Sequence, residues 1–309
     1  MKVWINGRFV PPHEAQVSLF DAGFQHGVGL FATMSARNGC IFRVMSHLER
    51  IKASAVQLGL LEVLQLEPLA DAIELTLVEN NATEARVRLT LTAGDLRMLK
   101  SPGVVGESSR NDPTIAIVVQ PPTPYPAELF ERGIRVCVAE PRLSTQDPFA
   151  GHKTIWYWPR LAELQRAAAR GCSEALFFTT SNRVASGAVS NLFLVKDGVL
   201  CTPRARDASE GGANSPVLPG VTRAVAIECA QDDGTEVQVH DLTIDDLLDA
   251  DEIFLTNSSW GILPVVGVEE SSIAGGSPGE MTMRLRAKYL DLVQSETLQS
   301  QADRVTPDE

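Results

Sequence analysis

The segment 191-NLFLVKDGVLCT-202 decides the fold class, because two short apolar runs flank the dipeptide formed by Asp197 and Gly198. Asp-Gly and Asn-Gly are the dipeptides that best adopt the type I′ turn of a two-residue β-hairpin. Asn-Gly dipeptides at positions 6–7 and 38–39 are also flanked by short apolar runs. The sequence therefore predicts antiparallel hairpins in both halves of the chain.

Amphipathic helices are predicted between groups of strands. In 46-SHLERIKASAVQLGL-60, Ser46 and Glu49 form a capping-box pattern, and Leu48, Ile51, Ala55 and Leu58 share one helical face. Further helices are predicted at 66–81, 127–133, 161–171, 221–231, 242–250 and 281–294. Hairpins with intervening helices favour an α+β fold over a doubly wound parallel sheet. The G-x-G-x-x-G and P-loop patterns of nucleotide-binding folds are absent from the sequence.

The proline-rich stretch 120-QPPTPYP-126 is the best candidate for an interdomain connector. We therefore expect a small N-terminal α+β domain at 1–120, a linker at 121–126 and a larger C-terminal domain at 127–309. The polar tail, about 295–309, is expected to be disordered.

The composition of the 309 residues is that of a globular protein, with 44% hydrophobic residues and a net charge of −12. Such an acidic chain lacks a broad basic face for nucleic acid or anionic membrane, and no apolar run reaches membrane-spanning length. The N-terminus predicts a strand and a turn rather than a signal peptide. The five cysteines are scattered without a C-x-x-C pair, which favours buried thiols in a reducing cytoplasm over a disulfide framework or a metal site.

Three polar segments have the chemistry of anion binding. In 218-LPGVTR-223 a glycine precedes a helix start, so that backbone N–H groups and the Thr222 hydroxyl are available to a phosphate; simple helix entry is the alternative. The run 256-TNSS-259 follows an apolar strand and is either an anion-binding loop or a plain turn. Arg50 is either a phosphate-binding residue or an ordinary surface arginine.

Lys153 stands beside an aromatic run in 151-GHKTIWYWPR-160. A lysine in this setting is either a surface residue at the edge of a hydrophobic patch or a desolvated, reactive amine. The segment alone does not decide between these alternatives.

The chain resembles the fold-type IV pyridoxal-phosphate enzymes, the class IV aminotransferase family. This family includes branched-chain aminotransferases, D-amino acid transaminases and 4-amino-4-deoxychorismate lyases. The resemblance covers about residues 1–290 and rests on segments in the family order: INGRFVP, FDAGFQHGVGLFATM, HLERIKAS, GHKT, EALFF, SNLFLVKDGVLCTP, LPGVTR, EIFLTNSSWGILPV and SPGEMTMRLRAKY. It implies a two-domain fold of antiparallel sheets with flanking helices, pyridoxal 5′-phosphate as cofactor, and a homodimer.

The resemblance also implies roles for individual residues. Lys153 matches the lysine that forms the Schiff base, and burial among aromatic neighbours would favour its reactive neutral amine. The matches to the phosphate-binding residues are Arg50, Val221, Thr222 and Ser258, with Asn257 beside the last. The resemblance implies substrate candidates in Arg86 and Arg88, which alternate on one face of a predicted strand. Tyr157 is a candidate for orienting substrate or cofactor, with a core tyrosine as the alternative.

The segment 184-VASGAVSNLFLV-195 departs from the family pattern V-x-E-G-x-x-S-N-[IL]-F, because Ser186 replaces the glutamate that bonds the pyridine nitrogen. A carboxylate there stabilises a protonated ring, which withdraws electrons from a carbanion at the substrate Cα; a neutral hydroxyl does so less. Ser186 therefore favours elimination over transamination, or a loss of activity.

Other departures affect the walls of the expected pocket. Val28 replaces an acidic residue of the family, Trp156 an asparagine and Ala93 an arginine found in many lyases. The loop LTNSSWGILPV is nearest to that of aminodeoxychorismate lyases.

We therefore expect a pyridoxal-phosphate enzyme acting on a small-molecule amino substrate by lyase-like elimination with release of pyruvate. Two alternatives remain: an aminotransferase for a small or branched-chain amino acid, and a non-catalytic relative. The Gly-rich loop 204–216 is either a flap over the pocket or a surface loop.

Overall fold

The computed structural model of the chain describes residues 1–95, 113–206 and 215–305. The chain forms two compact units, one of Met1–Pro122 with Lys153–Trp156 and one of Thr123–His152 with Tyr157–Glu309. The division at 122/123 lies inside the expected linker. The sequence assigned Lys153 to the C-terminal domain, whereas its segment packs with the first unit.

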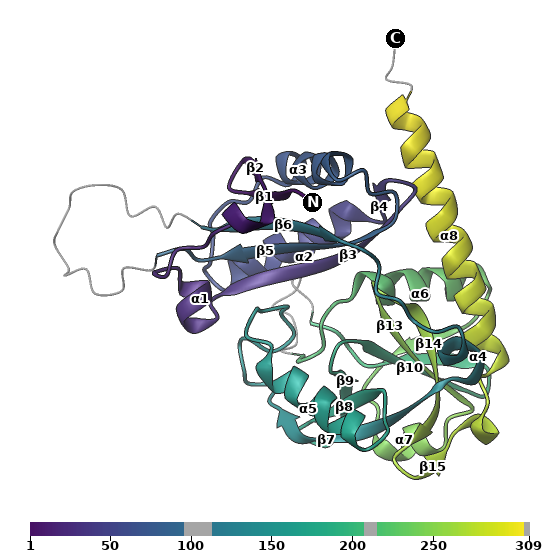
Figure 1. Ribbon diagram of the computed structural model, residues 1–309. Coiled ribbons are helices and arrows are strands. Elements are labelled where there is room, and N and C mark those ends of the chain that lie inside the picture. Colours follow the sequence, from purple (N-terminus) through teal and green to yellow (C-terminus); the bar gives the residue numbers. More distant parts are fainter. Residues whose placement is uncertain (96–112, 207–214, 306–309) are drawn as a thin grey trace. The chain divides into compact units, whose positions relative to one another are not determined.

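The first unit contains an antiparallel six-stranded sheet (Figure 1). The strands in spatial order are β2 (Arg8–Val10), β1 (Val3–Ile5), β6 (Ile115–Gln120), β5 (Ala85–Thr92), β3 (Gly29–Arg37) and β4 (Cys40–Ile41). Asn6 and Gly7 have φ values of 45° and 84°, and Asn38 and Gly39 have 52° and 75°. Positive φ at both central residues is what a type I′ turn requires, so the hairpins predicted at positions 6–7 and 38–39 are confirmed.

Helices α2 (Val44–Gln57) and α3 (Leu66–Glu79) share one hydrophobic core with this sheet. The remaining helical turns of the unit are η1 (Pro12–Glu14) and α1 (Ala22–His26). The predicted capping box of α2 is wrong: its N-cap is Arg43, which makes no side-chain cap. The helix begins two residues before Ser46, because Val44 and Met45 also pack against the core.

The second unit contains a nine-stranded sheet with the path β12-β11-β10-β13-β14-β7-β8-β9, from which β15 branches at β14. The strands are β7 (Ile134–Leu143), β8 (Glu174–Thr179), β9 (Val184–Gly187), β10 (Asn191–Lys196), β11 (Val199–Thr202), β12 (Val237–Val239), β13 (Glu252–Asn257), β14 (Gly261–Val268) and β15 (Ser271–Ser272). The helices are α4 (Glu128–Arg132), α5 (Trp158–Ala169), α6 (Val221–Asp232), α7 (Ile244–Leu248), η2 (Ala274–Gly276) and α8 (Glu280–Val305).

The predicted α+β class is confirmed, and the second sheet is mixed, with parallel pairs beside the expected antiparallel ones. Strand β7 is parallel to both β8 and β14, and β11 is parallel to β12. The chain passes from β7 to β8 through α5, a crossover that parallel neighbours require. Every residue of β8 is buried, as is typical of a strand covered on both faces.

Helix α8 continues through much of the tail that was expected to be disordered. Leu285, Tyr289, Val293 and Thr297 are all buried, with at most 8% of their surface exposed. Their spacing of four residues forms one helical stripe, so the packed face extends beyond position 295. Most of the expected flap, 207–214, lies outside the described residues.

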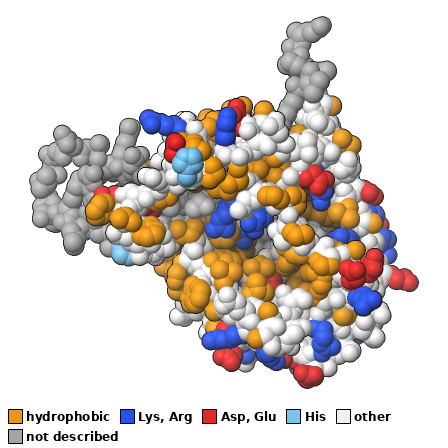
Figure 2. All heavy atoms as spheres, in the orientation of Figure 1, with side chains coloured by type: hydrophobic (Ala, Val, Ile, Leu, Met, Phe, Trp, Pro, Cys, Tyr) orange, Lys and Arg blue, Asp and Glu red, His pale blue; other side chains and the backbone are white. Residues whose placement is uncertain are grey.

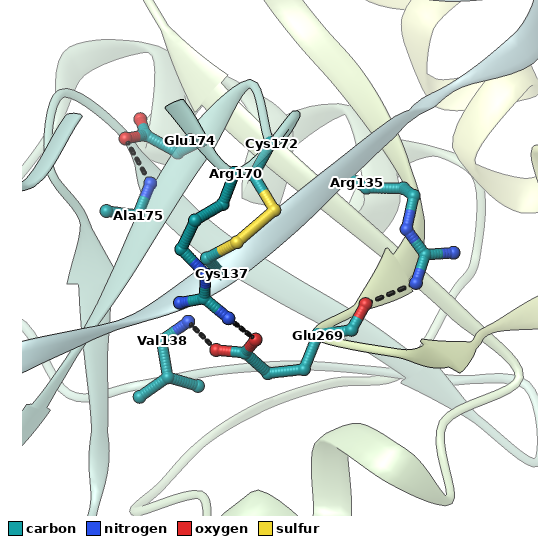
Figure 3. Close-up of a disulfide and its surroundings, with 8 residues drawn as sticks. All are labelled: Arg135, Cys137, Val138, Arg170, Cys172, Glu174, Ala175 and Glu269. Atoms are coloured by element: carbon teal, nitrogen blue, oxygen red, sulfur yellow. Dashed lines mark hydrogen bonds and ion pairs between the residues drawn. A yellow bond between two sulfur atoms is a disulfide. The ribbon is translucent and has the colours of Figure 1, made fainter. Parts of the chain in front are cut away.

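A disulfide joins Cys137 of β7 to Cys172, which lies just before β8 (Figure 3). The expectation that these cysteines are free thiols is wrong. Because β7 and β8 are parallel neighbours, the two Cα atoms lie 6.0 Å apart, a normal separation for a disulfide. Cys40, Cys201 and Cys229 are free and buried.

The carboxylate of Glu269 also interacts with β7 and with the chain just before Cys172. It accepts the Val138 N–H at 2.7 Å and pairs with Arg170 (Figure 3). Its backbone carbonyl accepts a hydrogen bond from Arg135. None of the described helices is both long and apolar enough to cross a membrane.

Candidate functional site

Lys153 is fixed by backbone hydrogen bonds to β3. Its carbonyl oxygen accepts the Phe31 N–H at 2.9 Å, and the Ile155 N–H donates to the Gly29 carbonyl at 3.0 Å. An isolated bridge between Leu30 and Thr154 lies between these bonds. The segment therefore extends the edge of the first sheet, which gives the lysine backbone a defined position.

The ring of Phe31 contacts two cations. Its centroid lies 4.7 Å from Lys153 Nζ and 3.8 Å from Arg88 Cζ, and the side chain is buried. Both distances are within cation–π range. Phe31 was missed by sequence reasoning, although it alternates with the core-facing residues Leu30 and Ala32 and so belongs to the other face of β3.

His47 adds a neutral polar group to this cluster. Its side chain is buried, and Arg50 Nη2 lies 3.5 Å from its Nδ1. Burial, followed by the positive charges of Arg50 and Lys153, holds the pKa of His47 well below its usual range. Because arginine only donates, Nδ1 is the acceptor and the hydrogen of the neutral ring is on Nε2. The spacing of His47 and Arg50 on one helix was the available signal.

The two candidate arginines of β5 have different surroundings. Arg88 lies over the ring of Phe31, which Lys153 also contacts. Arg86 instead donates to Gln120 Oε1 at 2.5 Å at an exposed position. The first unit therefore brings Lys153, Arg50 and Arg88 together as a cationic cluster, and Arg86 is not part of these contacts.

The aromatic residues after Lys153 do not enclose it as expected. Trp156 is 63% exposed and Trp158 is 68% exposed. Figure 2 shows hydrophobic side chains gathered on the surface over the part of the second unit where Figure 1 draws α5. Tyr157 donates its hydroxyl hydrogen to the Ala188 carbonyl at 2.9 Å, so it holds the backbone after β9.

In the second unit, the N-terminus of α6 has the features of an anion-binding site. Gly220 is its N-cap and has no side chain to cap the helix. Val221 and Thr222 are buried in the first turn, where unpaired N–H groups and the helix dipole favour an anion. Arg223 anchors the turn by donating to the Pro203 carbonyl at 3.0 Å, and burial lowers its pKa to about 10.

Asn191 connects the α6 turn to β13. Its amide donates to the Leu218 carbonyl at 2.9 Å, and its backbone pairs with Thr256. A Cβ at Gly220 would lie 2.1 Å from Asn191 Oδ1, so the close approach requires glycine. The buried Thr256 hydroxyl has no hydrogen-bond partner among the described residues.

The loop after β13 is shaped by Asn257. Its Oδ1 accepts the N–H groups of Ser259 at 2.9 Å and Trp260 at 3.0 Å, and its Nδ2 donates to the Val189 carbonyl at 3.3 Å. These bonds fix the turn that carries Ser258, which is half-buried.

Ser186, on β9, lies beside an arginine. Its hydroxyl is buried and accepts a hydrogen bond from Arg160 Nη1 at 3.3 Å. The carboxylate of Glu174 holds the following residues, accepting the Ala188 N–H at 3.0 Å and the Ser190 hydroxyl at 2.9 Å. Burial raises the pKa of Glu174, and these hydrogen bonds oppose the shift. Sequence reasoning missed Arg160 because its contact with Ser186 is tertiary.

The second unit thus links its candidate residues through hydrogen bonds between three segments, 186–191, 218–222 and 256–260. Pyridoxal phosphate fits the groups present. The uncapped α6 turn and the unpartnered Thr256 hydroxyl offer donors to a phosphate. The first unit supplies Lys153 and Arg50 beside a neutral histidine, and Arg88 over the Phe31 ring. No group of three or more His, Cys, Asp or Glu residues that could together hold a metal ion occurs in the described part of the chain.

Comparison with known proteins gives one family. The family model "Amino-transferase class IV" matches residues 29–268. A putative branched-chain-amino-acid aminotransferase of Methanocaldococcus jannaschii is 33% identical over 293 residues, which cover 94% of this chain and 96% of that protein. The aminodeoxychorismate lyase of Bacillus subtilis is 28% identical over 289 residues, 93% of either chain.

Solved structures similar to this chain belong to the same family. A branched-chain amino acid aminotransferase of T.th., solved with pyridoxamine 5′-phosphate, has a TM-score of 0.84 and 28% identity, covering 95% of this chain and 94% of its own. The α+β architecture, the order of the motifs and the match over most of the chain lead to one conclusion. The chain belongs to the class IV aminotransferases, the family of fold-type IV pyridoxal-phosphate enzymes.

Proposed function

We propose that the chain binds one pyridoxal phosphate through Lys153 and acts at the Cα atom of an amino substrate. The observation that carries the proposal is the cluster in the first unit. Lys153 is pinned to β3, and its ammonium contacts the Phe31 ring beside the neutral His47 and Arg50. The backbone of the lysine is thus fixed, and its amine lies at the ring that Arg88 also contacts.

We propose that the phosphate is held by Arg50, the N–H groups of Val221 and Thr222, and Ser258, with Asn257 shaping the loop. The uncapped helix start and the guanidinium are both suited to a doubly charged anion. When bound, the cofactor supplies an aldehyde for attachment of amines and an electron-accepting ring. The Lys153 amine would be the base that takes the proton from the substrate Cα. Arg88 is the candidate for a substrate carboxylate.

Ser186 favours elimination with release of pyruvate, the type of reaction that aminodeoxychorismate lyases of this family catalyse. A buried serine beside Arg160 provides no carboxylate to stabilise a protonated ring. The second candidate is amino transfer from a small or branched-chain amino acid. It is favoured by the Methanocaldococcus jannaschii relative, which carries that name at 33% identity.

The first experiment tests attachment. Purified full-length protein loaded with pyridoxal phosphate is treated with borohydride, digested and analysed by mass spectrometry. We expect the reduced cofactor on Lys153, its loss in Lys153→Ala, and its retention in the control Lys52→Ala, which removes an exposed lysine of α2. A colourless protein that pyridoxal phosphate cannot restore would overturn the proposal in favour of a non-catalytic relative.

The second experiment separates the two reactions. Conversion of aminodeoxychorismate without a keto acid supports elimination. Amino transfer that requires a keto acid supports the aminotransferase. The homodimer and the cytoplasmic location stay predictions, and the mass of the native protein by light scattering tests the first.

A further inference from the structure

We propose that Arg160, acting through Ser186, holds the pyridine nitrogen of the bound cofactor in its neutral, hydrogen-bond-accepting form. This inference rests on the proposed function. It assigns Arg160 as a positioning residue.

Arg160 is held firmly by one short segment. Its Nη1 donates to Ser186 Oγ at 3.3 Å, to the Gly187 carbonyl at 3.0 Å and to the Ala188 carbonyl at 3.3 Å. Its Cζ lies 5.2 Å from the centroid of the Phe177 ring. Phe177 is the register partner of Ser186 across β8 and β9, so the guanidinium is anchored on both strands.

The positive charge of Arg160 has no carboxylate partner within 4 Å among the described residues. The nearby buried carboxylate of Glu174 is committed elsewhere. It accepts N–H groups from Ala175, Ala188 and Val189, and the Ser190 hydroxyl. Arg160 thus binds the carbonyls of this segment while Glu174 binds its N–H groups, and the guanidinium charge stays available to whatever lies beside Ser186.

The direction of the Arg160–Ser186 hydrogen bond determines what Ser186 can offer. Because the guanidinium only donates, Ser186 Oγ is the acceptor, and the hydroxyl hydrogen remains for a second partner. Donation into the oxygen strengthens that hydrogen as a donor. A neutral pyridine nitrogen accepts such a hydrogen bond, whereas a protonated one is itself a donor.

The charge acts in the same direction as the hydrogen bond. A protonated ring next to a partly buried guanidinium brings two positive charges together, which disfavours the protonated form. With a glutamate in place of Ser186 the local charge would favour a protonated ring. The Ser186–Arg160 pair therefore weakens the ring as an electron acceptor, which disfavours amino transfer and leaves elimination less affected.

The test observes the ring nitrogen directly. Pyridoxal phosphate carrying 15N at the ring position is loaded on the full-length protein, and its 15N NMR shift is compared with the shifts of the neutral and protonated free cofactor. We expect the neutral shift for the unaltered protein. We expect the protonated shift for Ser186→Glu. In Arg160→Gln we expect the pKa of the ring nitrogen to rise, so that a pH titration shows protonation at a higher pH than in the unaltered protein.

The control is Arg142→Gln, which removes another arginine of the second unit with similar contacts. Arg142 donates to the Ala139 carbonyl at 2.7 Å, and its Cζ lies 5.6 Å from the Phe178 centroid. It should leave the shift unchanged. Ser186→Ala provides a second test if Arg160→Gln does not retain cofactor: the guanidinium charge remains, and the nitrogen should stay neutral with the shift of a pyridine lacking a hydrogen bond.

A protonated nitrogen in the unaltered protein overturns the inference and leaves the proposed function intact, since the cofactor is bound. An Arg160→Gln variant that binds cofactor with an unchanged nitrogen titration removes Arg160 from the account. A protein that binds no pyridoxal phosphate overturns both this inference and the proposed function.

Discussion

Lys153 is joined to Phe31 in two ways: its carbonyl oxygen accepts the Phe31 N–H at 2.9 Å, and its Nζ lies 4.7 Å from the centroid of the Phe31 ring. Backbone and side chain of the lysine are therefore positioned by the same residue of β3. A change at Phe31 that leaves the backbone bond intact isolates the contribution of the ring.

We expect Phe31→Leu to impair the lysine without removing it. Because the ring packs against the Lys153 side chain and makes a cation–π contact with Arg88, its loss should lower kcat/KM by about threefold to thirtyfold, which corresponds to about 0.6–2 kcal/mol. Steady-state kinetics of whichever reaction the second experiment detects, elimination or amino transfer, measures the effect. The matched control is Phe42→Leu, since Phe42 is also buried and has the Arg43 guanidinium 5.6 Å from its ring. Equal losses in both variants would mean that the ring matters only for packing.

The buried His47 predicts how stability changes with pH. Its pKa is held well below the usual range in the folded protein, first by burial and then by Arg50 and Lys153. The unfolded chain therefore binds a proton that the folded chain does not bind as the pH falls below about 6.5. The stability that neutral His47 contributes is present above that pH and is lost below it, by up to about 1.4 kcal/mol per pH unit.

We expect the free energy of unfolding of His47→Gln to fall less steeply between neutral pH and pH 5 than that of the unaltered protein. Urea unfolding at a series of pH values measures both slopes. His152, whose pKa burial lowers to about 4, is present in both proteins, so the difference reports His47 alone. Parallel slopes would contradict a neutral histidine at this place.

Gly220→Ala tests the close approach at the start of α6. The backbone there has φ −74° and ψ 136°, which alanine adopts readily, so the effect comes from contact with Asn191 Oδ1. We expect a destabilisation of about 1–3 kcal/mol and weaker binding of pyridoxal phosphate, because the first helical turn must shift. Spectroscopic titration with the cofactor measures the second effect. Adding Asn191→Ala should restore part of the affinity for pyridoxal phosphate. If Gly220→Ala alone changes neither stability nor affinity, the turn can accommodate a Cβ atom at position 220.

The disulfide predicts a sensitivity to reductant. Cys137 and Cys172 are 35 residues apart in sequence, and the loss of a cross-link closing such a loop costs about 4 kcal/mol on the chain-entropy estimate. Chemical unfolding with and without reductant should show a difference of that order, which disappears in Cys137→Ser with Cys172→Ser. The three free cysteines remain in that variant and serve as the internal control. A denaturation midpoint that reductant does not change would mean that the hydrogen bonds of Glu269 hold this region without the disulfide.

Local chemistry determined what the sequence could predict of the fold. The hairpins at positions 6–7 and 38–39 follow from asparagine and glycine at positive φ, and these were found. Strand β9 was missed, because VASG has few residues typical of strands and owes its conformation to pairing with β8. The parallel order of β7, β8 and β14 likewise depends on contacts between distant segments.

The candidate site divides in the same way. Lys153, Arg50 and Thr222 could be predicted as site residues because they belong to short motifs with a fixed order. His47 could have been found from its place one turn before Arg50. Arg160 could not, because the distance of 26 residues between it and Ser186 carries no periodic signal. The structure also separates Arg88 from Arg86, which strand alternation alone puts on the same face.

The bond between Cys137 and Cys172 makes the intervening chain a covalent ring, and Lys153, Tyr157 and Arg160 all belong to it. A single proteolytic nick anywhere in that ring would therefore not divide the polypeptide into two pieces. The severed protein would keep one molecular mass until a reductant opened the second path around the ring.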